Sequence, residues 1–390
     1  MKKSLAIVVA VLLAVAMFAG CANTNNQPSQ APASEKPSEA ASTQPSEAPS
    51  EAPAEAAAGY EIAMITDKGT IDDKSFNQGT WEGIKAFADA NGKTKQYYKP
   101  TEVSDAAYLA SIDLAVKGGA KMIVCPGFLF ETAVYEAQTK YPDVKFILID
   151  GEPHTADYAT YKTEPNVLCF IFAEDQVGFY AGYAAVKDGF TKLGYQGGQS
   201  VPAVVRYGYG FVQGAEAAAT EMGLPDGSIS IMYNYSGDFA ATPENQARAA
   251  GWYQSGTEII FAAGGSVGNS VMSAAEASTD KFVIGVDVDQ SGESDTVIAS
   301  AMKMLGNAVQ DGLKAFYDGT FEGGRTIHAD SSNNGVGMTT DTSKWRKFTT
   351  EDYNTLFEAV KSGKYTINNS IDAKIADFGL KKVKVTEVTD

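Results

Sequence analysis

From residue 60 onward, short apolar runs alternate with amphipathic stretches along the chain. Apolar runs of four to six residues fit buried strands, and the stretches between them have the apolar spacing of helices. The predicted strands are 62–65, 121–125, 145–150, 167–172, 203–207, 228–233, 258–262 and 282–287. The predicted helices between them include 106–117, 176–187, 212–222 and 243–254. Strands that alternate with helices form parallel sheets with helices on both faces, so the pattern predicts an α/β protein.

The last part of the chain continues this pattern less clearly. We predict strands at 296–300 and 336–340, helices at 303–318 and 351–362, and a mixed segment at 375–388. Solenoid or propeller repeats are not evident, so the chain is not predicted to be a repeat protein.

The α/β pattern occurs twice, once before and once after about Glu174, which predicts two similar lobes. We assign residues 59–172 and about 300–320 to the first lobe, and about 173–299 and 321–390 to the second. The chain would then cross between the lobes near Ala173, Ser300 and Thr320.

The N-terminal segment has a different composition from the rest. Two lysines, an apolar run and small residues precede Cys21, so we predict a secretory signal peptide at 1–20. Its apolar core is shorter than the ~20 residues that a membrane-spanning helix needs. Residues 21–58 are rich in Ala, Pro, Ser and Glu, which predicts a disordered tether. FAGC at 18–21 resembles a bacterial lipobox, which would attach lipid to Cys21 and anchor the protein on the extracytoplasmic face of the cell membrane.

Charge and composition narrow the possible partners and cofactors. The net charge of −17 argues against nucleic acid, which needs a basic surface to neutralise phosphates. Cys125 and Cys169 lie in apolar strands and are predicted to be buried thiols. His154 and His328 are the two histidines, and neither is close in sequence to a cysteine, so no zinc cluster is expected. We expect a monomer that needs no metal ion or other cofactor.

Polar residues and glycines recur where the predicted strands end. Ligands of α/β domains bind beyond the carboxyl ends of the strands, so these positions are candidates for a ligand site. A capping or turn role could explain any one of them, but their recurrence favours a polar ligand site. The candidate ligand-binding residues are Asp67, Phe76, Asn77, Asp150, Phe239, Gly265, Asp287 and Lys303.

The segment 67–78 carries the pattern D-x-G-x-x-D-D-x-S-F-N-Q, and the run DDKSFNQG spans 72–79. With this motif, the chain from about residue 60 onward resembles the basic membrane protein family of bacterial lipoproteins. The resemblance implies a two-lobed type I periplasmic-binding-protein fold with the ligand in the interlobe cleft. It also implies a purine-nucleoside receptor that feeds an ABC importer, with membrane permease subunits as partners.

The chemistry of a nucleoside matches the candidates. Phe76 and Phe239 could stack on the two faces of the base. Asn77 and Asp150 offer hydrogen-bond donors and acceptors to its edge. Phe239 could instead anchor its loop on the core, and Phe211 is a competing lining residue.

The remaining candidates suit the sugar. Asp287 can accept hydrogen bonds from ribose hydroxyls, as acidic residues do in dinucleotide sites. Lys303 could donate to the same oxygens, although a surface position would also explain it. Gly265 would permit close approach of the backbone to the ligand. The family resemblance implies the same aromatic pair on the base and the same Asp and Lys on the ribose.

Other interpretations remain open at this point. The segment 287–295 begins like a calcium loop, but its twelfth position is Ile298 rather than a bidentate Glu. Asp67, Asp72 and Asp73 could hold calcium in a nucleoside hydrolase, although helix capping is simpler, and we predict that the chain is not an enzyme. The same fold could bind a sugar or a signalling molecule, and a surface antigen would need no polar cleft.

Overall fold

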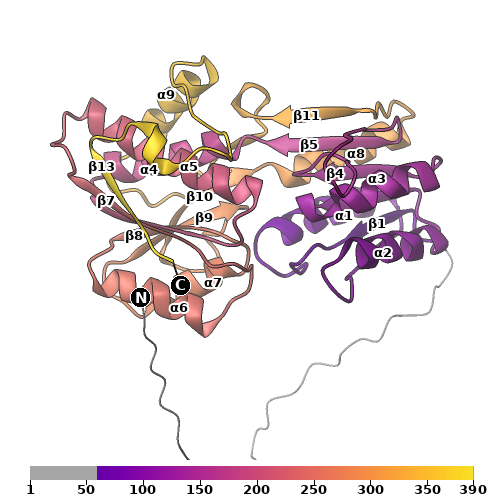
Figure 1. Cartoon of the computed structure of the whole chain (residues 1–390), viewed down its shortest axis with the longest axis horizontal. Helices are drawn as coiled ribbons and strands as arrows, with labels where there is room; N and C mark the ends of the chain where they lie inside the picture. Colours follow the sequence, from indigo (N-terminus) through magenta and orange to yellow (C-terminus); the bar gives the residue numbers. More distant parts are fainter. Residues whose placement is uncertain (1–58, 390) are drawn as a thin grey trace, which may run out of the picture. The chain divides into compact units, whose positions relative to one another are not determined.

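The computed structural model describes residues 59–389 (Figure 1). The predicted signal peptide, the tether and Cys21 lie outside these residues. Two parallel α/β sheets with helices on both faces make up the described chain, as the hydrophobic pattern predicts.

The first sheet has six parallel strands in the order β11-β5-β4-β3-β1-β2. Its buried strands are apolar on both faces because helices cover each side, with Ile62 and Met64 in one core cluster and Ala63 and Ile65 in another. The strands are β1 (Ile62–Ile65), β2 (Lys95–Tyr98), β3 (Met122–Pro126), β4 (Lys145–Ile149), β5 (Val167–Phe172) and β11 (Arg325–Ala329). The helices are α1 (Phe76–Asn91), α2 (Asp105–Lys117), α3 (Glu131–Lys140) and α8 (Leu305–Tyr317), with a short η1 (Phe128–Phe130).

The second sheet has seven strands in the order β12-β10-β9-β8-β6-β7-β13, and β12 alone of these runs antiparallel to its neighbour. Its strands are β6 (Lys192–Gly197), β7 (Ile229–Tyr235), β8 (Ile259–Ala263), β9 (Phe282–Asp287), β10 (Val297–Lys303), β12 (Val336–Met338) and β13 (Val383–Glu387). Its helices are α4 (Glu174–Asp188), α5 (Pro202–Glu221), α6 (Pro243–Gln254), α7 (Val267–Glu276) and α9 (Thr350–Lys361), with η2 (Ser331–Asn333) and η3 (Ile375–Phe378).

The chain passes between the two sheets three times, from β5 into α4, from β10 into α8, and from β11 to β12. The sheets divide the later residues differently from our expectation. β10 belongs to the second sheet up to Lys303, and β11 pairs with β5 in the first sheet although we expected 321–390 in the second lobe. β11 is a partly exposed edge strand, so its sequence has no continuous apolar run to mark it.

The predicted strand at 203–207 is wrong, because these residues lie in α5. Pro202 starts this helix, and most of its length is buried, so its apolar residues form a run like that of a buried strand. Glycines allow α4 and α5 to pack in close contact. A Cβ atom on Gly178 would lie 2.1 Å from the Tyr207 carbonyl oxygen, and one on Gly210 would lie 2.0 Å from the Asp175 carbonyl oxygen.

Candidate functional site

A cavity of about 710 Å³, including the part open to solvent, lies at the carboxyl ends of strands from both sheets. All eight candidate residues line it, so the structure brings them together: Asp67, Phe76, Asn77, Asp150, Phe239, Gly265, Asp287 and Lys303. Phe211, the competing residue, is fully buried in the core and does not line the cavity.

The loop between β1 and α1 is held by a network of carboxylates and one amide. Asp73 accepts hydrogen bonds from the backbone N–H groups of Ser75, Asn77 and Gln78, so it caps α1. The Asn77 side-chain nitrogen donates to Asp67 Oδ1 at 2.9 Å and to Asp73 Oδ2 at 3.0 Å. Asn77 therefore orients two carboxylates as well as lining the cavity. Burial raises the pKa of Asp73 to about 6 and also raises the pKa of Asp67.

Each lobe places one aspartate at the end of a central strand, Asp150 after β4 and Asp287 at the end of β9. Both residues have left-handed backbone conformations, with φ of 60° and 66°. Such a conformation is uncommon for a residue other than glycine and occurs often at functional sites. Asp287 accepts a hydrogen bond on each oxygen, from Ser75 Oγ at 2.5 Å and from the Tyr207 hydroxyl at 3.1 Å.

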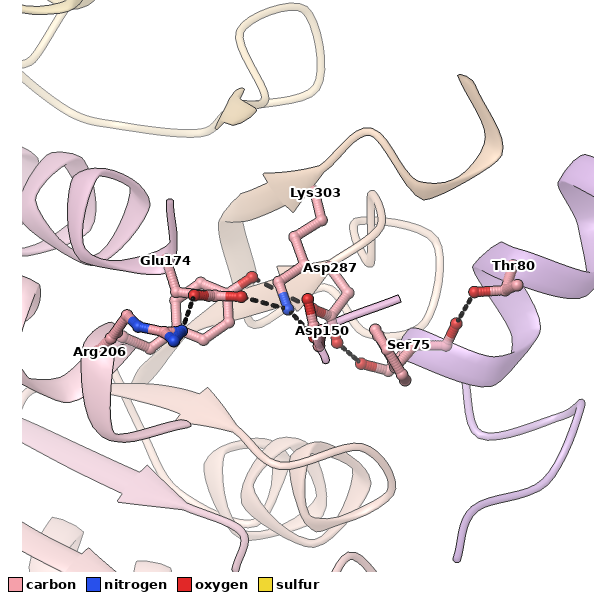
Figure 2. Close-up of polar contacts among 9 residues, drawn as sticks. Ser75, Thr80, Asp150, Glu174, Arg206, Asp287 and Lys303 are labelled. Carbon is pink, nitrogen blue, oxygen red and sulfur yellow. Dashed lines mark hydrogen bonds and ion pairs between the residues drawn. The ribbon is translucent and has the colours of Figure 1, made fainter. Parts of the chain in front are cut away.

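Lys303 is 3% exposed, so it is not a surface lysine. Its Nζ lies 2.5 Å from Asp150 Oδ2 and 2.8 Å from Glu174 Oε1, and Arg206 lies 3.3 Å from the other Glu174 oxygen (Figure 2). Burial lowers the pKa of Lys303, but Asp150, Glu174 and Asp287 raise it by more, so the ammonium stays charged. Burial raises the pKa of Asp150 against the opposing effect of Lys303.

One oxygen of Asp150 is unused by the described protein. Asp150 Oδ1 is buried and has no hydrogen-bond partner among these residues, while Oδ2 contacts Lys303. A buried carboxylate oxygen without a partner is costly, so this atom offers an acceptor to a hydroxyl or N–H group of a ligand.

Aromatic rings supply the apolar part of the cavity. Phe76 lies in the first turn of α1, where Thr80 donates a hydrogen bond to its carbonyl oxygen. Lys303 Nζ lies 5.1 Å from the centre of the Phe76 ring, within cation–π range. Phe239 packs against two glycines. A Cβ atom on Gly198 would lie 2.5 Å from the Phe239 ring, and one on Gly265, whose φ is 56°, would lie 3.6 Å from Phe239 Cβ.

Sequence reasoning missed Glu174, Arg206 and Tyr207. Arg206 and Tyr207 lie in α5, in the segment 203–207 for which the sequence predicts a strand. A strand at these positions gives no reason to expect their side chains near the cavity. Glu174 directly follows the crossing from β5, and this position at a predicted hinge is the signal that could have found it.

The structure also bears on the hydrolase and calcium interpretations. Asp72 is exposed and Asp73 caps α1, so the three aspartates of this loop do not converge on one point. Within residues 59–389, groups of three or more His, Cys, Asp and Glu side chains arranged to hold a metal ion are absent. The same part of the chain has no helix with the length and apolar character needed to cross a membrane.

Two α/β lobes with a cavity at the ends of their strands define the type I periplasmic-binding-protein fold. Solved structures with this fold include an ABC transporter solute-binding protein from Aeropyrum pernix, at a TM-score of 0.68 and 21% identity over 80% of this chain and 94% of that one. Another, from Conexibacter woesei, has a TM-score of 0.63 and 23% identity over 80% and 99%.

The chain belongs to the Bmp family, described as ABC transporter substrate-binding protein PnrA-like, whose model matches residues 60–373. The resemblance seen in the sequence is therefore confirmed, and the chain is a substrate-binding protein and not an enzyme. Its relatives include the ABC transporter nucleoside-binding protein BmpA of Lactococcus lactis, 29% identical over 72% of this chain and 81% of that one. Basic membrane protein A of Borreliella burgdorferi is 30% identical over 71% and 78%.

Proposed function

We propose that the protein binds a nucleoside, preferentially a purine nucleoside, between its lobes and delivers it to the membrane permease of an ABC importer. The observation that carries this proposal is a single cavity lined by Phe76, Phe239, Asp287 and the Lys303–Asp150 ion pair. The Lactococcus lactis relative, which is named as nucleoside-binding, supports the same class of ligand.

Each part of a nucleoside has a matching group in the cavity. The base has two flat faces, and Phe76 and Phe239 offer rings for stacking worth about 0.5–1.5 kcal/mol beyond the burial of apolar area. The free oxygen of Asp150 accepts a hydrogen bond from the ligand. Asp287 and Lys303 bind the sugar hydroxyls. These hydroxyls are neutral, which suits a site with more carboxylates than cations.

Binding stabilises a closed arrangement of the lobes, because the ligand contacts residues of both. The closed protein then docks on the permease, which supplies transport while its ATPase partner supplies energy. We further propose that lipid on Cys21 anchors the protein to the extracytoplasmic face of the membrane. Cys21 lies outside the described residues.

The test is calorimetric titration of the purified protein with guanosine, inosine, cytidine, uridine, free bases and ribose. We expect purine nucleosides to bind more tightly than free bases or ribose. Tight binding of ribose without guanosine would overturn the proposal in favour of a sugar ligand. Incubation with inosine is expected to release no free base, and release with turnover would contradict a binding function.

A matched pair of aromatic variants locates the site. Phe76→Ala is expected to weaken nucleoside binding more than tenfold, equivalent to about 1.4 kcal/mol, because one face of the base loses its ring. Tyr158→Ala removes an exposed aromatic ring outside the cavity and is expected to leave affinity unchanged. Equal affinities for Phe76→Ala and the parent protein would place the ligand elsewhere.

A further inference from the structure

Two segments from different lobes meet beside the cavity. One follows the carboxyl end of β9 in the second sheet, and the other runs from the loop before α1 into the first turn of that helix in the first lobe. Four residues of these segments are outside the cavity lining: Lys74, Gly79, Val288 and Gln290. Contacts among these four therefore join the lobes without involving a ligand in the cavity.

Gln290 is fully buried, and hydrogen bonds within the second lobe hold it in place. Its Oε1 accepts a hydrogen bond from the Val286 N–H at 2.9 Å, and its own backbone N–H donates to Ser300 Oγ at 3.0 Å. Its Nε2 then donates to the Lys74 carbonyl oxygen at 2.7 Å, across the lobes. Because the side chain is already held, little rotamer freedom is lost when this last bond forms.

A close apolar contact accompanies this hydrogen bond. A Cβ atom placed on Gly79 would lie 2.6 Å from Val288 Cγ1, so the bare backbone of α1 allows Val288 to approach. Lys74 also forms an ion pair with Glu293 at 3.5 Å. The two side chains of this ion pair are each about one-third exposed, so the pair adds little to the contact between the lobes.

We propose that Lys74, Gly79, Val288 and Gln290 form an interlobe latch that holds the lobes closed in the absence of ligand. A latch of this kind shifts the open–closed equilibrium toward the form that binds, so less of the ligand's binding free energy is used for closure. The segment after β9, which begins like a calcium loop, thereby has a structural role that needs no metal. The inference does not depend on which ligand the cavity takes.

The test measures the distance between the lobes in full-length protein stripped of ligand. Spin labels at Ala90→Cys and Ala277→Cys, both exposed, report this distance by double electron–electron resonance in a Cys21→Ser background. Cys125 and Cys169 are buried, so they do not take the label. We expect a closed population in the parent protein without any added nucleoside.

Gly79→Ala adds a methyl group between the lobes while strengthening α1, since alanine favours a helix over glycine. It is expected to lower the closed-to-open ratio at least fivefold, about the effect of one net hydrogen bond. Adding Val288→Ala removes the atom that the new methyl group meets and is expected to restore the ratio. Recovery would assign the effect to this contact, because the neighbouring Leu305 is unchanged.

Gln290→Glu provides an independent variant. It keeps an acceptor for the Val286 N–H but sets a carboxylate oxygen against the Lys74 carbonyl, so the closed population is expected to fall. Ser291→Ala, in the same segment but bonded to Asp289 within its own lobe, is expected to behave as the parent. An entirely open parent protein, or an unchanged distance distribution in Gly79→Ala, would overturn the latch. These measurements use no nucleoside, so their outcome is separate from that of the nucleoside titration.

Discussion

The two lobes each supply an aspartate with the same backbone conformation, yet the surroundings of the two side chains differ. Asp150 contacts a buried cation through one oxygen, and its other oxygen has no hydrogen-bond partner among residues 59–389. Asp287 accepts a hydrogen bond from a hydroxyl on each oxygen and forms no ion pair with a residue of the described chain. The two lobes thus place hydrogen-bond acceptors with different surroundings at equivalent strand ends. The first balances the charge of Lys303, and the second is oriented by Ser75 and Tyr207.

The largest expected effect comes from removing the cation beside Asp150. Lys303→Met keeps an apolar chain of similar length but leaves Asp150 and Glu174 without their shared partner. Breaking a buried ion pair in this way usually costs about 3–5 kcal/mol. Urea unfolding at pH 7 should show a loss of this size together with loss of ligand binding.

Lys314→Met is the matched control for this variant. Its ion pair with Asp318 is solvent-exposed, so the free energy of unfolding is expected to change by no more than about 1 kcal/mol. Equal losses in the two variants would mean that Lys303 contributes as a surface lysine does, contrary to its burial.

The second prediction removes the other acceptor. Asp287→Ala deletes the carboxylate that Ser75 and Tyr207 orient, and nucleoside affinity measured by calorimetry is expected to fall more than tenfold, about 1.4 kcal/mol or more. Asp289→Ala, two residues along the chain and bonded to Thr342 on the surface, is expected to retain affinity. Retention in both variants would remove Asp287 from the binding site.

These two aspartates also show how far the sequence could predict the site. All eight candidates line one cavity, because parallel strands bring their carboxyl ends to the same edge of a sheet. A polar residue that follows an apolar run can therefore be assigned to this edge from the sequence. The motif at 67–78 could identify the family, but not the hydrogen bonds inside it. Nothing in the sequence indicates that Asn77 would bond to both Asp67 and Asp73.

The residues that contact Asp287 and Lys303 from other elements could not be predicted from the ends of apolar runs. Tyr207 reaches Asp287 from α5, a buried helix whose apolar residues imitate a strand. Glu174 contacts Lys303 only because the chain crosses between the sheets there. The place of β11 in the first sheet could not be predicted for a related reason, since β11 is a partly exposed edge strand that joins the sheet by pairing with β5 and has no apolar pattern of its own.

The third prediction separates the two aspartates by pH. Burial raises the pKa of both above the ordinary value of 3.8, so the folded protein binds a proton at each site more readily than the unfolded chain. As pH rises above about 4, each group therefore makes the free energy of unfolding smaller, by at most about 1.4 kcal/mol per pH unit. Unfolding measured from pH 4 to 7 should decline less in Asp287→Asn and in Asp150→Asn than in the parent.

The size of this flattening compares the two environments directly. Lys303 opposes the effect of burial on the pKa of both aspartates, but it contacts Asp150 directly. The direct partners of Asp287 in the described chain are the hydroxyls of Ser75 and Tyr207. We therefore expect Asp287→Asn to flatten the pH dependence more than Asp150→Asn. The reverse order would mean that Ser75, Tyr207 and the charge of Lys303 together stabilise the charged form of Asp287 better than Lys303 stabilises that of Asp150.

The smallest expected effect tests the hydroxyl partners of Asp287. Tyr207→Phe removes one hydrogen bond, at 3.1 Å, and leaves the ring in the cavity and the Ser75 bond in place. A single net hydrogen bond is worth about 0.5–1.5 kcal/mol, so nucleoside affinity is expected to fall by a factor of about 2 to 13. If Asp287 binds the sugar, affinity for the free base should not change, because the stacking rings are untouched. Tyr235→Phe, whose hydroxyl bonds to Tyr233 away from the cavity, is the control. An equal loss for base and nucleoside would show that Tyr207 acts through packing and that Asp287 is not oriented by its hydroxyl.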